Sequence, residues 1–268
     1  MFFPRCLELA VIVSLSSPSL TLSFFHTAPT SLPHPICMLP DFGEMLTGGK
    51  LEAETDLPFS PLCDTSSTSD RKRVFAIQER GLSFTGEDFD VFEGESGSSF
   101  AKCRGAMMHL PGKDKMKIRS TITDEETVVL DRVLMTATPT YDIYRGGGNR
   151  EKLGWIEKEL ISLTETFDVF MEGSGFGVFK SPPAYRISGN FLEKNFVMKN
   201  GKGQVVAKVT KDSLIQFDSF NHYQVQVAPL MDAMLVIACA CAIDEALDEE
   251  NKEKKEEEKR KEGKEGWF

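Results

Sequence analysis

Short runs in which apolar and polar positions alternate follow one another from about residue 72 to residue 229, with turn residues between them. An alternation with a period of two predicts β-strands that bury one face. The runs are "KRVFAIQ", "DFDVFEG", "SSFAKCRG", "DKMKIRST", "TVVLDRV", "YDIYRGGG", "GWIEKELIS", "TFDVFMEG", "AYRISGN", "NFVMKNGKG", "QVVAKVT" and "YQVQVAP". Many short strands at close spacing predict an antiparallel barrel or sandwich.

Turns and an internal repeat refine this prediction. Asn200-Gly201 lies between two of the runs, and both residues accept positive φ, so a tight primed hairpin turn is predicted there. The motif "FDVFEGESG" at 89–97 returns as "FDVFMEGSG" at 167–175, an offset of 78 residues. The repeat predicts a sheet built from two similar halves, with chance similarity between short strand motifs as the alternative.

One segment after the last run has the pattern of a helix. Pro229 suits a first helical turn, and Asp232 suits the positive end of the helix dipole. The 11 residues between Asp232 and Asp244 are all uncharged. The larger side chains and cysteines that we expect to form a core helix are Met234, Leu235, Val236, Ile237, Cys239, Cys241 and Ile243.

The length of this apolar segment decides between a membrane anchor and a core element. Eleven helical residues span ~16 Å, about half the hydrocarbon core of a bilayer, which is too short to cross it. A helix that is apolar on all faces must be surrounded by protein, and a closed sheet is the simplest surround. Full burial of six of its larger side chains would contribute on the order of 10 kcal/mol, so loss of the helix should unfold the domain.

The first 71 residues lack such a pattern. Residues 1–37 begin with a single Arg, an apolar stretch and several serines, as in a secretory or organellar targeting segment. Glu8 and Pro18 interrupt it and Met38 offers a later start, so an overextended gene model is the alternative. Residues 38–71 are rich in Pro, Ser and Thr, which predicts a disordered linker.

Composition restricts the classes of partner. The chain has 268 residues, 41% of them hydrophobic and 27% charged, as in a soluble globular domain with tails. A net charge of −10 argues against a nucleic-acid partner. Six cysteines without C-x-x-C spacing predict free thiols in a reducing compartment. Cys239 and Cys241 would point about 200° apart on a helix, so they cannot share a metal ion, and no cofactor motif is present.

Two stretches, "YRISGNFLEKNFVMKNGKGQVVAKV" at 185–209 and "YQVQVAPLMDAMLVIACACAIDEAL" at 223–247, carry a resemblance to a known family. They resemble the LURP-one-related family of tubby C-terminal-like proteins. The second stretch is similar to the family's Tyr-x-Val-x-Val-x-Pro-Gly-x-Asp segment before an apolar helix, although Leu230 stands where the family usually has Gly.

The resemblance implies a mainly β fold, a 12-stranded antiparallel barrel that encloses one central hydrophobic C-terminal α-helix. Tubby proteins and phospholipid scramblases share this fold. The expected domain covers 72–247, and 248–268 is then a charged solvated tail. The family implies no established catalytic activity; plant members are linked to pathogen defence, and tubby relatives bind phosphoinositides.

The segment "PGKDKMKIRST" carries the candidate binding residues. On a strand, Lys113, Lys115, Lys117 and Arg119 would project from one face at ~6.6 Å intervals. Such a ladder could hold the phosphates of an inositol lipid or contact an anionic membrane surface. The alternative is the solvated outer face of an edge strand that is kept charged against aggregation.

The residues indicate no catalytic constellation, because His109 and His222 lie in or beside strands without a nucleophile partner. Our leading hypothesis is a non-enzymatic domain that binds anionic phospholipid head groups, located in the cytoplasm or peripherally at a membrane. A genuine targeting segment would make it organellar or secretory instead. The alternatives are a stress or defence scaffold whose protein partner contacts the tail, which has nine acidic and seven basic residues over 248–266, and a scramblase-like lipid transfer activity.

Overall fold

The computed structural model describes residues 49–63, 67–79, 88–105, 115–148, 150–160, 165–175, 180–211 and 222–265. The predicted targeting segment at 1–37 lies outside these residues. The described elements are strands β1 Arg73–Glu79, β2 Phe89–Glu93, β3 Ser99–Arg104, β4 Lys115–Ser120, β5 Glu126–Arg132, β6 Thr140–Arg145, β7 Lys152–Lys158, β8 Thr166–Met171, β9 Tyr185–Asn190, β10 Asn195–Asn200, β11 Val205–Thr210 and β12 His222–Val227, and helix α3 Ala233–Glu265.

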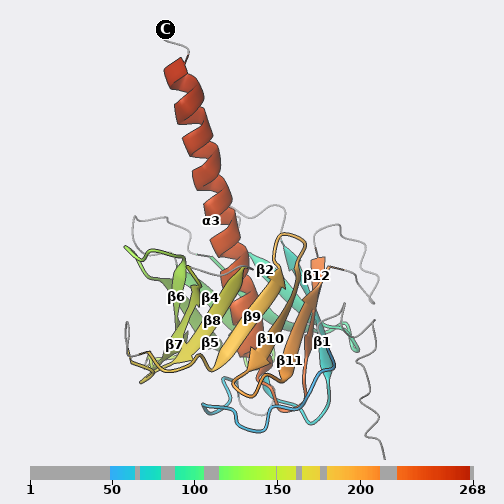
Figure 1. Ribbon diagram of the computed structural model, residues 1–268. Helices are drawn as coiled ribbons and strands as arrows, with labels where there is room; N and C mark the ends of the chain where they lie inside the picture. Colours follow the sequence, from blue (N-terminus) through green and yellow to red (C-terminus); the bar gives the residue numbers. More distant parts are fainter. Residues whose placement is uncertain are drawn as a thin grey trace, which may run out of the picture. The chain divides into compact units, whose positions relative to one another are not determined.

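The twelve strands close into an antiparallel barrel in which each strand pairs with its neighbours in sequence. The barrel closes where β1 pairs with β12, with Arg73 opposite Val227. Figure 1 shows α3 running through the space that the strands surround and continuing beyond it. The predicted fold class, a 12-stranded barrel around one C-terminal helix, is therefore confirmed.

The apolar half of α3 forms the centre of the hydrophobic core. Every residue from Ala233 to Ile243 is at most 3% exposed, as expected for a helix that is apolar on all faces. Large side chains from the inner faces of the strands and from one connection pack around it, among them Phe75, Ile77, Phe100, Ile118, Leu130, Ile143, Phe167, Ile187 and Phe191. The alternation in the sequence thus separates core from solvent along strands such as β4 and β9, whereas Thr166 to Phe170 of β8 are all buried.

The start of α3 differs in one detail from the prediction. Pro229 lies in a turn ahead of the helix, not in its first turn, because α3 begins only at Ala233. Asp232 is the N-cap: its Oδ1 accepts the backbone N–H groups of Met234 at 2.9 Å and Leu235 at 3.1 Å. Such a cap satisfies N–H groups that the first helical turn leaves without intrahelical partners.

The second oxygen of Asp232 binds residues that the sequence assigned to a disordered linker. Oδ2 accepts the backbone N–H of Leu62 at 2.8 Å and the hydroxyl of Ser67 at 2.9 Å. Leu62, Cys63 and Ser67 are buried. Burial raises the pKa of Asp232, and these hydrogen bonds oppose the rise. The cap therefore joins the helix to a segment far away in sequence.

The described part of the predicted linker lies against the barrel. Leu51 bridges to Val205, and the backbone N–H of Glu54 donates to the carbonyl of Pro229 at 2.9 Å. Arg145 of β6 donates to the carbonyl of Pro61 at 2.9 Å. The prediction of a disordered linker is wrong for residues 49–63 and 67–71, because backbone hydrogen bonds and a few buried side chains hold them.

The hairpin between β10 and β11 exists, but its turn is not the predicted one. The connection comprises residues 201–204, and neither Asn200 nor Gly201 has a positive φ; Gly203 does, at 78°. The Asn200 side chain organises the loop, because its Oδ1 accepts the backbone N–H groups of Lys202 at 3.1 Å and Gln204 at 3.0 Å. Asparagine thus acts here as a side-chain cap of a longer loop.

Ion pairs hold α3 where it leaves the barrel. Arg132 of β5 pairs with Glu249 at 2.7 Å, and Lys158 of β7 pairs with Glu250 at 2.7 Å. Asp244 of the helix pairs with Lys194 of the β9–β10 turn. The helix then continues to Glu265, so the first residues of the predicted tail contact the barrel and the rest prolong the helix.

The repeated motif occupies opposite walls of the barrel. Its two copies form β2 and β8, which are six strands apart in a closed ring of twelve. In each copy the aspartate pairs with an arginine of the following strand: Asp90 with Arg104 at 2.7 Å, and Asp168 with Arg186 at 2.8 Å. The two halves of the barrel therefore share an outward-facing ion pair as well as a strand sequence.

Candidate functional site

The predicted basic ladder lies on β4, and the structure describes part of it. Met116, Ile118 and Ser120 are buried, whereas Lys117 and Arg119 between them are exposed on the outer face. Lys113 lies outside the described residues, and only the backbone of Lys115 is described. The alternation along the strand thus holds for the residues that can be placed.

The strand β4 is not an edge strand, contrary to the alternative that its charge suggested. It is hydrogen-bonded to β3 on one side and to β5 on the other. Charges that protect a free edge are therefore not required at this position. The outward cations need another explanation, either solubility or binding.

The register between β3 and β4 adds two cations that reasoning along one strand missed. Lys102 lies directly opposite Arg119, and Arg104 lies directly opposite Lys117. We call these four residues the basic block. Cross-strand neighbours have Cβ atoms about 4.5–5.5 Å apart, and like charges in such pairs repel each other. The outer face of the barrel thus carries two adjacent like-charged pairs, each of which we call a row: Lys102 with Arg119, and Arg104 with Lys117.

Carboxylates on the neighbouring strands and in the β4–β5 connection partly balance the basic block. Lys117 pairs with Glu126 at 2.7 Å, and Arg119 pairs with Asp124 at 3.3 Å. Arg104 pairs with Asp90, as described above. Among the described residues, Lys102 makes no ion pair. The side chains of Lys117 and Arg119 are each more than half exposed, so their ion pairs contribute only about 0–1 kcal/mol and a competing anion can replace them.

The cysteines that the sequence analysis considered as a metal site lie in the hydrophobic core. Cys239 and Cys241 are buried in α3, and burial raises the pKa of the Cys239 thiol to about 12. Cys241 Sγ lies 3.6 Å from Cys103 Sγ of β3, and this contact together with burial raises the pKa of Cys103. Neither thiol environment favours a reactive thiolate at neutral pH. The four described cysteines are free thiols: Cys63, Cys103, Cys239 and Cys241.

The outer wall of β6 to β8 carries an aromatic patch beside a hollow of about 350 Å³. Trp155 stacks on Phe170 with ring centroids 5.1 Å apart, and the Lys180 ammonium lies 4.0 Å from the Phe170 centroid. Lys180 also pairs with Glu157, and Lys152 pairs with Asp142 at 2.9 Å. Lys152 and Lys180 are paired and are less exposed than Lys117 and Arg119, so this hollow offers an anion less than the basic block does.

Comparisons with a family profile and with solved structures found similar proteins. The sequence profile of the LURP-one-related family matches residues 73–244, which begin at the first residue of β1 and end within α3. The chain belongs to the LURP-one-related family. The X-ray structure of an Arabidopsis thaliana protein is similar over 69% of this chain and 96% of that one, with 16% identity and a TM-score of 0.51. None of the curated proteins compared matches the sequence.

Membership of the LURP-one-related family accounts for the barrel and the central helix. Leu230, where the family resemblance led us to expect a glycine, has a φ of 65° and is 45% exposed. A leucine therefore adopts here a conformation that glycine adopts freely. In the part of the chain that the structure describes, no helix combines the length and apolarity needed to cross a membrane.

Proposed function

We propose that this LURP-one-related protein is a non-catalytic binding module whose basic block contacts the phosphates of an anionic lipid head group, with phosphoinositides as the ligand class. The observation that carries the proposal is the double row of like-charged pairs on the outer face of β3 and β4. Phosphate oxygens placed between the rows would relieve the repulsion within both pairs.

Because the chain is acidic overall, a local basic block would decide which face of the protein contacts an anionic membrane. With a net charge of −10, most of the surface is repelled by an anionic membrane. Each Lys or Arg near an anionic surface contributes about 1 kcal/mol of attraction. The exposed cations Lys102, Lys117 and Arg119 would therefore contribute about 3 kcal/mol together, which corresponds to about a 100-fold change in affinity.

Liposome co-sedimentation of the full chain tests the proposal. We expect binding to vesicles that contain a phosphoinositide and none to pure phosphatidylcholine vesicles. The triple variant Lys102→Ala, Lys117→Ala, Arg119→Ala should reduce binding about 100-fold. A matched variant, Lys199→Ala, Lys252→Ala, Lys254→Ala, loses three exposed cations elsewhere and should bind almost as wild type. Equal losses of binding in both variants would show that net charge alone causes the effect, and this would refute the site.

A second candidate function is a scaffold that binds a protein through the end of α3. The observation that favours it is that the helix continues to Glu265, so the charges of the predicted tail lie on an ordered element. A truncation should remove residues 251–268 only, because Glu249 and Glu250 pair with the barrel. A pull-down that captures the same partners with and without these residues would reject this function.

A further inference from the structure

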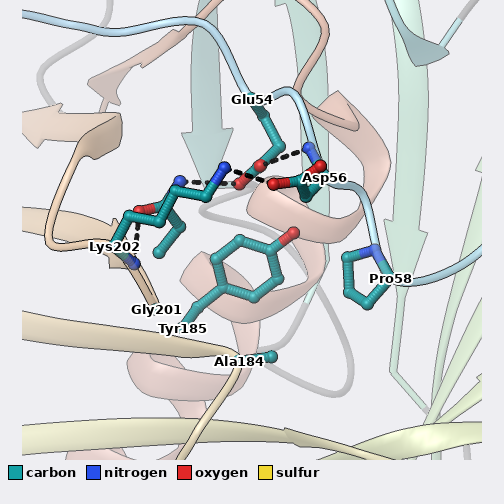
Figure 2. A pocket seen from close by; sticks show the side chains of 8 residues that line it. Glu54, Asp56, Pro58, Ala184, Tyr185, Gly201 and Lys202 are labelled. Atoms are coloured by element: carbon teal, nitrogen blue, oxygen red, sulfur yellow. Dashed lines mark hydrogen bonds and ion pairs between the residues drawn. The ribbon is translucent and has the colours of Figure 1, made fainter.

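A pocket of about 230 Å³ lies where residues 54–58 cover the start of β9 and the β10–β11 loop. Figure 2 shows its two sides: carboxylates and the Lys202 side chain on one, and the Tyr185 ring with Pro58 and Ala184 on the other. The pocket is polar at one end and apolar along its walls. It is separate from the basic block, because β9 lies six strands away from β3.

The hydroxyl of Tyr185 is the least explained polar group in this pocket. Tyr185 is 1% exposed, and its Oη has no hydrogen-bond partner within the described chain. Burial and the negative charge of Glu54 raise the pKa of Tyr185, so the hydroxyl keeps its proton. Figure 2 shows the hydroxyl directed into the space between Asp56 and Pro58. Buried polar groups are nearly always paired, so this one indicates a missing partner.

The carboxylates of the pocket are also short of positive charge. Glu54 is 3% exposed and accepts only neutral donors, the N–H of Asp56 at 3.0 Å and the side-chain amide of Asn200 at 3.2 Å. Among the described residues Glu54 makes no ion pair. Asp56 pairs with Lys202, whose ammonium also donates to the Thr55 hydroxyl at 3.4 Å. Lys202, on a surface loop, is thus the one cation at the mouth of the pocket among the described residues.

We infer that this pocket binds a small organic cation, a primary ammonium or guanidinium group carried by a free amine or by a single basic side chain. The cation donates to Glu54, Asp56 and the Tyr185 oxygen, while its alkyl part lies on Pro58, Ala184 and the tyrosine ring. The face of an aromatic ring adds attraction for a cation. Drug-sized ligands need about 300–1,000 Å³, so the smaller volume fits one side-chain-sized group.

A metal ion is a poorer occupant of this pocket. The described residues contain no cluster of three or more His, Cys, Asp or Glu that could hold one. Two carboxylates and a neutral hydroxyl give fewer charged ligands than hard divalent cations usually take in proteins. A cation that brings its own N–H donors suits the three acceptors better.

The Lys202 ammonium would then compete with the ligand for Asp56, so a substitution of Lys202 gives the sharpest test. The probes are butylamine and butylguanidine, with butanol and butyrate as uncharged and anionic analogues, each titrated into the full chain by isothermal calorimetry. We expect Lys202→Met to bind both cationic probes at least about 10-fold more tightly than wild type, and neither analogue to bind. The inference is overturned if Lys202→Met does not bind the cationic probes saturably, or if it binds butanol equally well.

Two substitutions separate ligand binding from folding. Tyr185→Phe removes a hydroxyl that has no partner in the fold, so it should leave the Tm unchanged or raised while weakening the cationic probes about 3- to 10-fold. Glu54→Gln should weaken them about 10- to 100-fold. Glu52→Gln is the matched control: Glu52 bonds Gln204 outside the pocket, so its loss should leave binding unchanged. A Tyr185→Phe variant with a lower Tm and unchanged binding would make the hydroxyl structural and refute the site.

A second set of titrations distinguishes the two sources of the cation. Acetyl-lysine methylamide and acetyl-arginine methylamide present the same groups on a peptide-like backbone. Tighter binding of these probes than of the free amines to Lys202→Met assigns the pocket to a basic side chain of a polypeptide, and weaker binding assigns it to a free amine. These titrations use no lipid, so their outcome is independent of the anionic head-group proposal.

Discussion

Replacement of Asp232 by alanine should destabilise this protein more than any other single hydrogen-bonding change described here. Its carboxylate is fully buried and receives four hydrogen bonds, two from the first turn of α3 and two from Leu62 and Ser67. Loss of an N-cap costs about 1 kcal/mol. The N–H of Leu62 and the hydroxyl of Ser67 would each lose a buried partner, at about 1–3 kcal/mol apiece.

The sum is about 3–7 kcal/mol, a large part of the 5–15 kcal/mol that typical domains possess. Asp232→Asn should cost less, about 1–3 kcal/mol, because an asparagine oxygen still caps the helix. Its amide group, however, faces the N–H of Leu62 as a second donor. The expected order of stability is therefore wild type, then Asp232→Asn, then Asp232→Ala.

Equilibrium unfolding in urea, followed by far-UV circular dichroism, measures these differences if the slope of the transition is unchanged. Lys252→Ala on the exposed part of the same helix is the control and should lie within about 0.5 kcal/mol of wild type. The reasoning fails if Asp232→Ala costs less than about 1 kcal/mol, or if Asn and Ala are equally destabilising. The first result would mean that the contacts of Leu62 and Ser67 add nothing to the cap, and the second that the cap adds nothing to those contacts.

Three further substitutions test the fold by unfolding measurements. Leu230→Gly should raise stability by about 1 kcal/mol in urea, because the exposed leucine has a positive φ; a decrease would indicate that its side chain matters more than its backbone. Val236→Asp places a charge in the core helix and should leave no folded protein, so a soluble variant with a native circular dichroism spectrum would overturn the core assignment. Gly154→Ala would put its Cβ 1.9 Å from the Phe170 carbonyl oxygen and should cost about 3 kcal/mol or more, whereas Gly148→Ala, which meets nothing within 4 Å, should be nearly neutral.

The strands could be predicted from the sequence because their signal is local. Alternation along each run depends only on which face is buried, and β4 shows it clearly, with Met116 and Ile118 inside and Lys117 and Arg119 outside. The position of β4 in the sheet depends on partners elsewhere in the chain. Alternation alone therefore left an edge strand open, and only the pairing with β3 and β5 excludes it.

The covering segment at 49–63 could not be predicted in this way. Its contacts are backbone hydrogen bonds, such as those from Glu52 to Val205 and from Glu54 to Pro229, and such bonds leave no periodic pattern of side chains. Its Pro- and Ser-rich composition is shared with disordered chains. The pocket at Tyr185 was missed for the same reason, because one of its walls belongs to this segment.

The two halves of the barrel give an internal comparison that bears on the basic block. Opposite each repeated aspartate lies a cation, Lys102 opposite Asp90 and Arg186 opposite Asp168. The next strand adds a second cation in both halves, Arg119 opposite Lys102 and Lys199 opposite Arg186.

One row of cations, Lys102 with Arg119 and Arg186 with Lys199, is therefore common to both halves. The next outward row differs: it is Arg104 and Lys117 in the first half, but Ser188 and Val197 in the second. In the second half the aspartate pairs with the common row, through Arg186, whereas in the first half Asp90 pairs with Arg104 of the additional row and Lys102 makes no ion pair among the described residues. The extra like-charged pair is the feature that a bound anion would explain, and Lys199 on the opposite wall is for that reason the right control in the vesicle experiment.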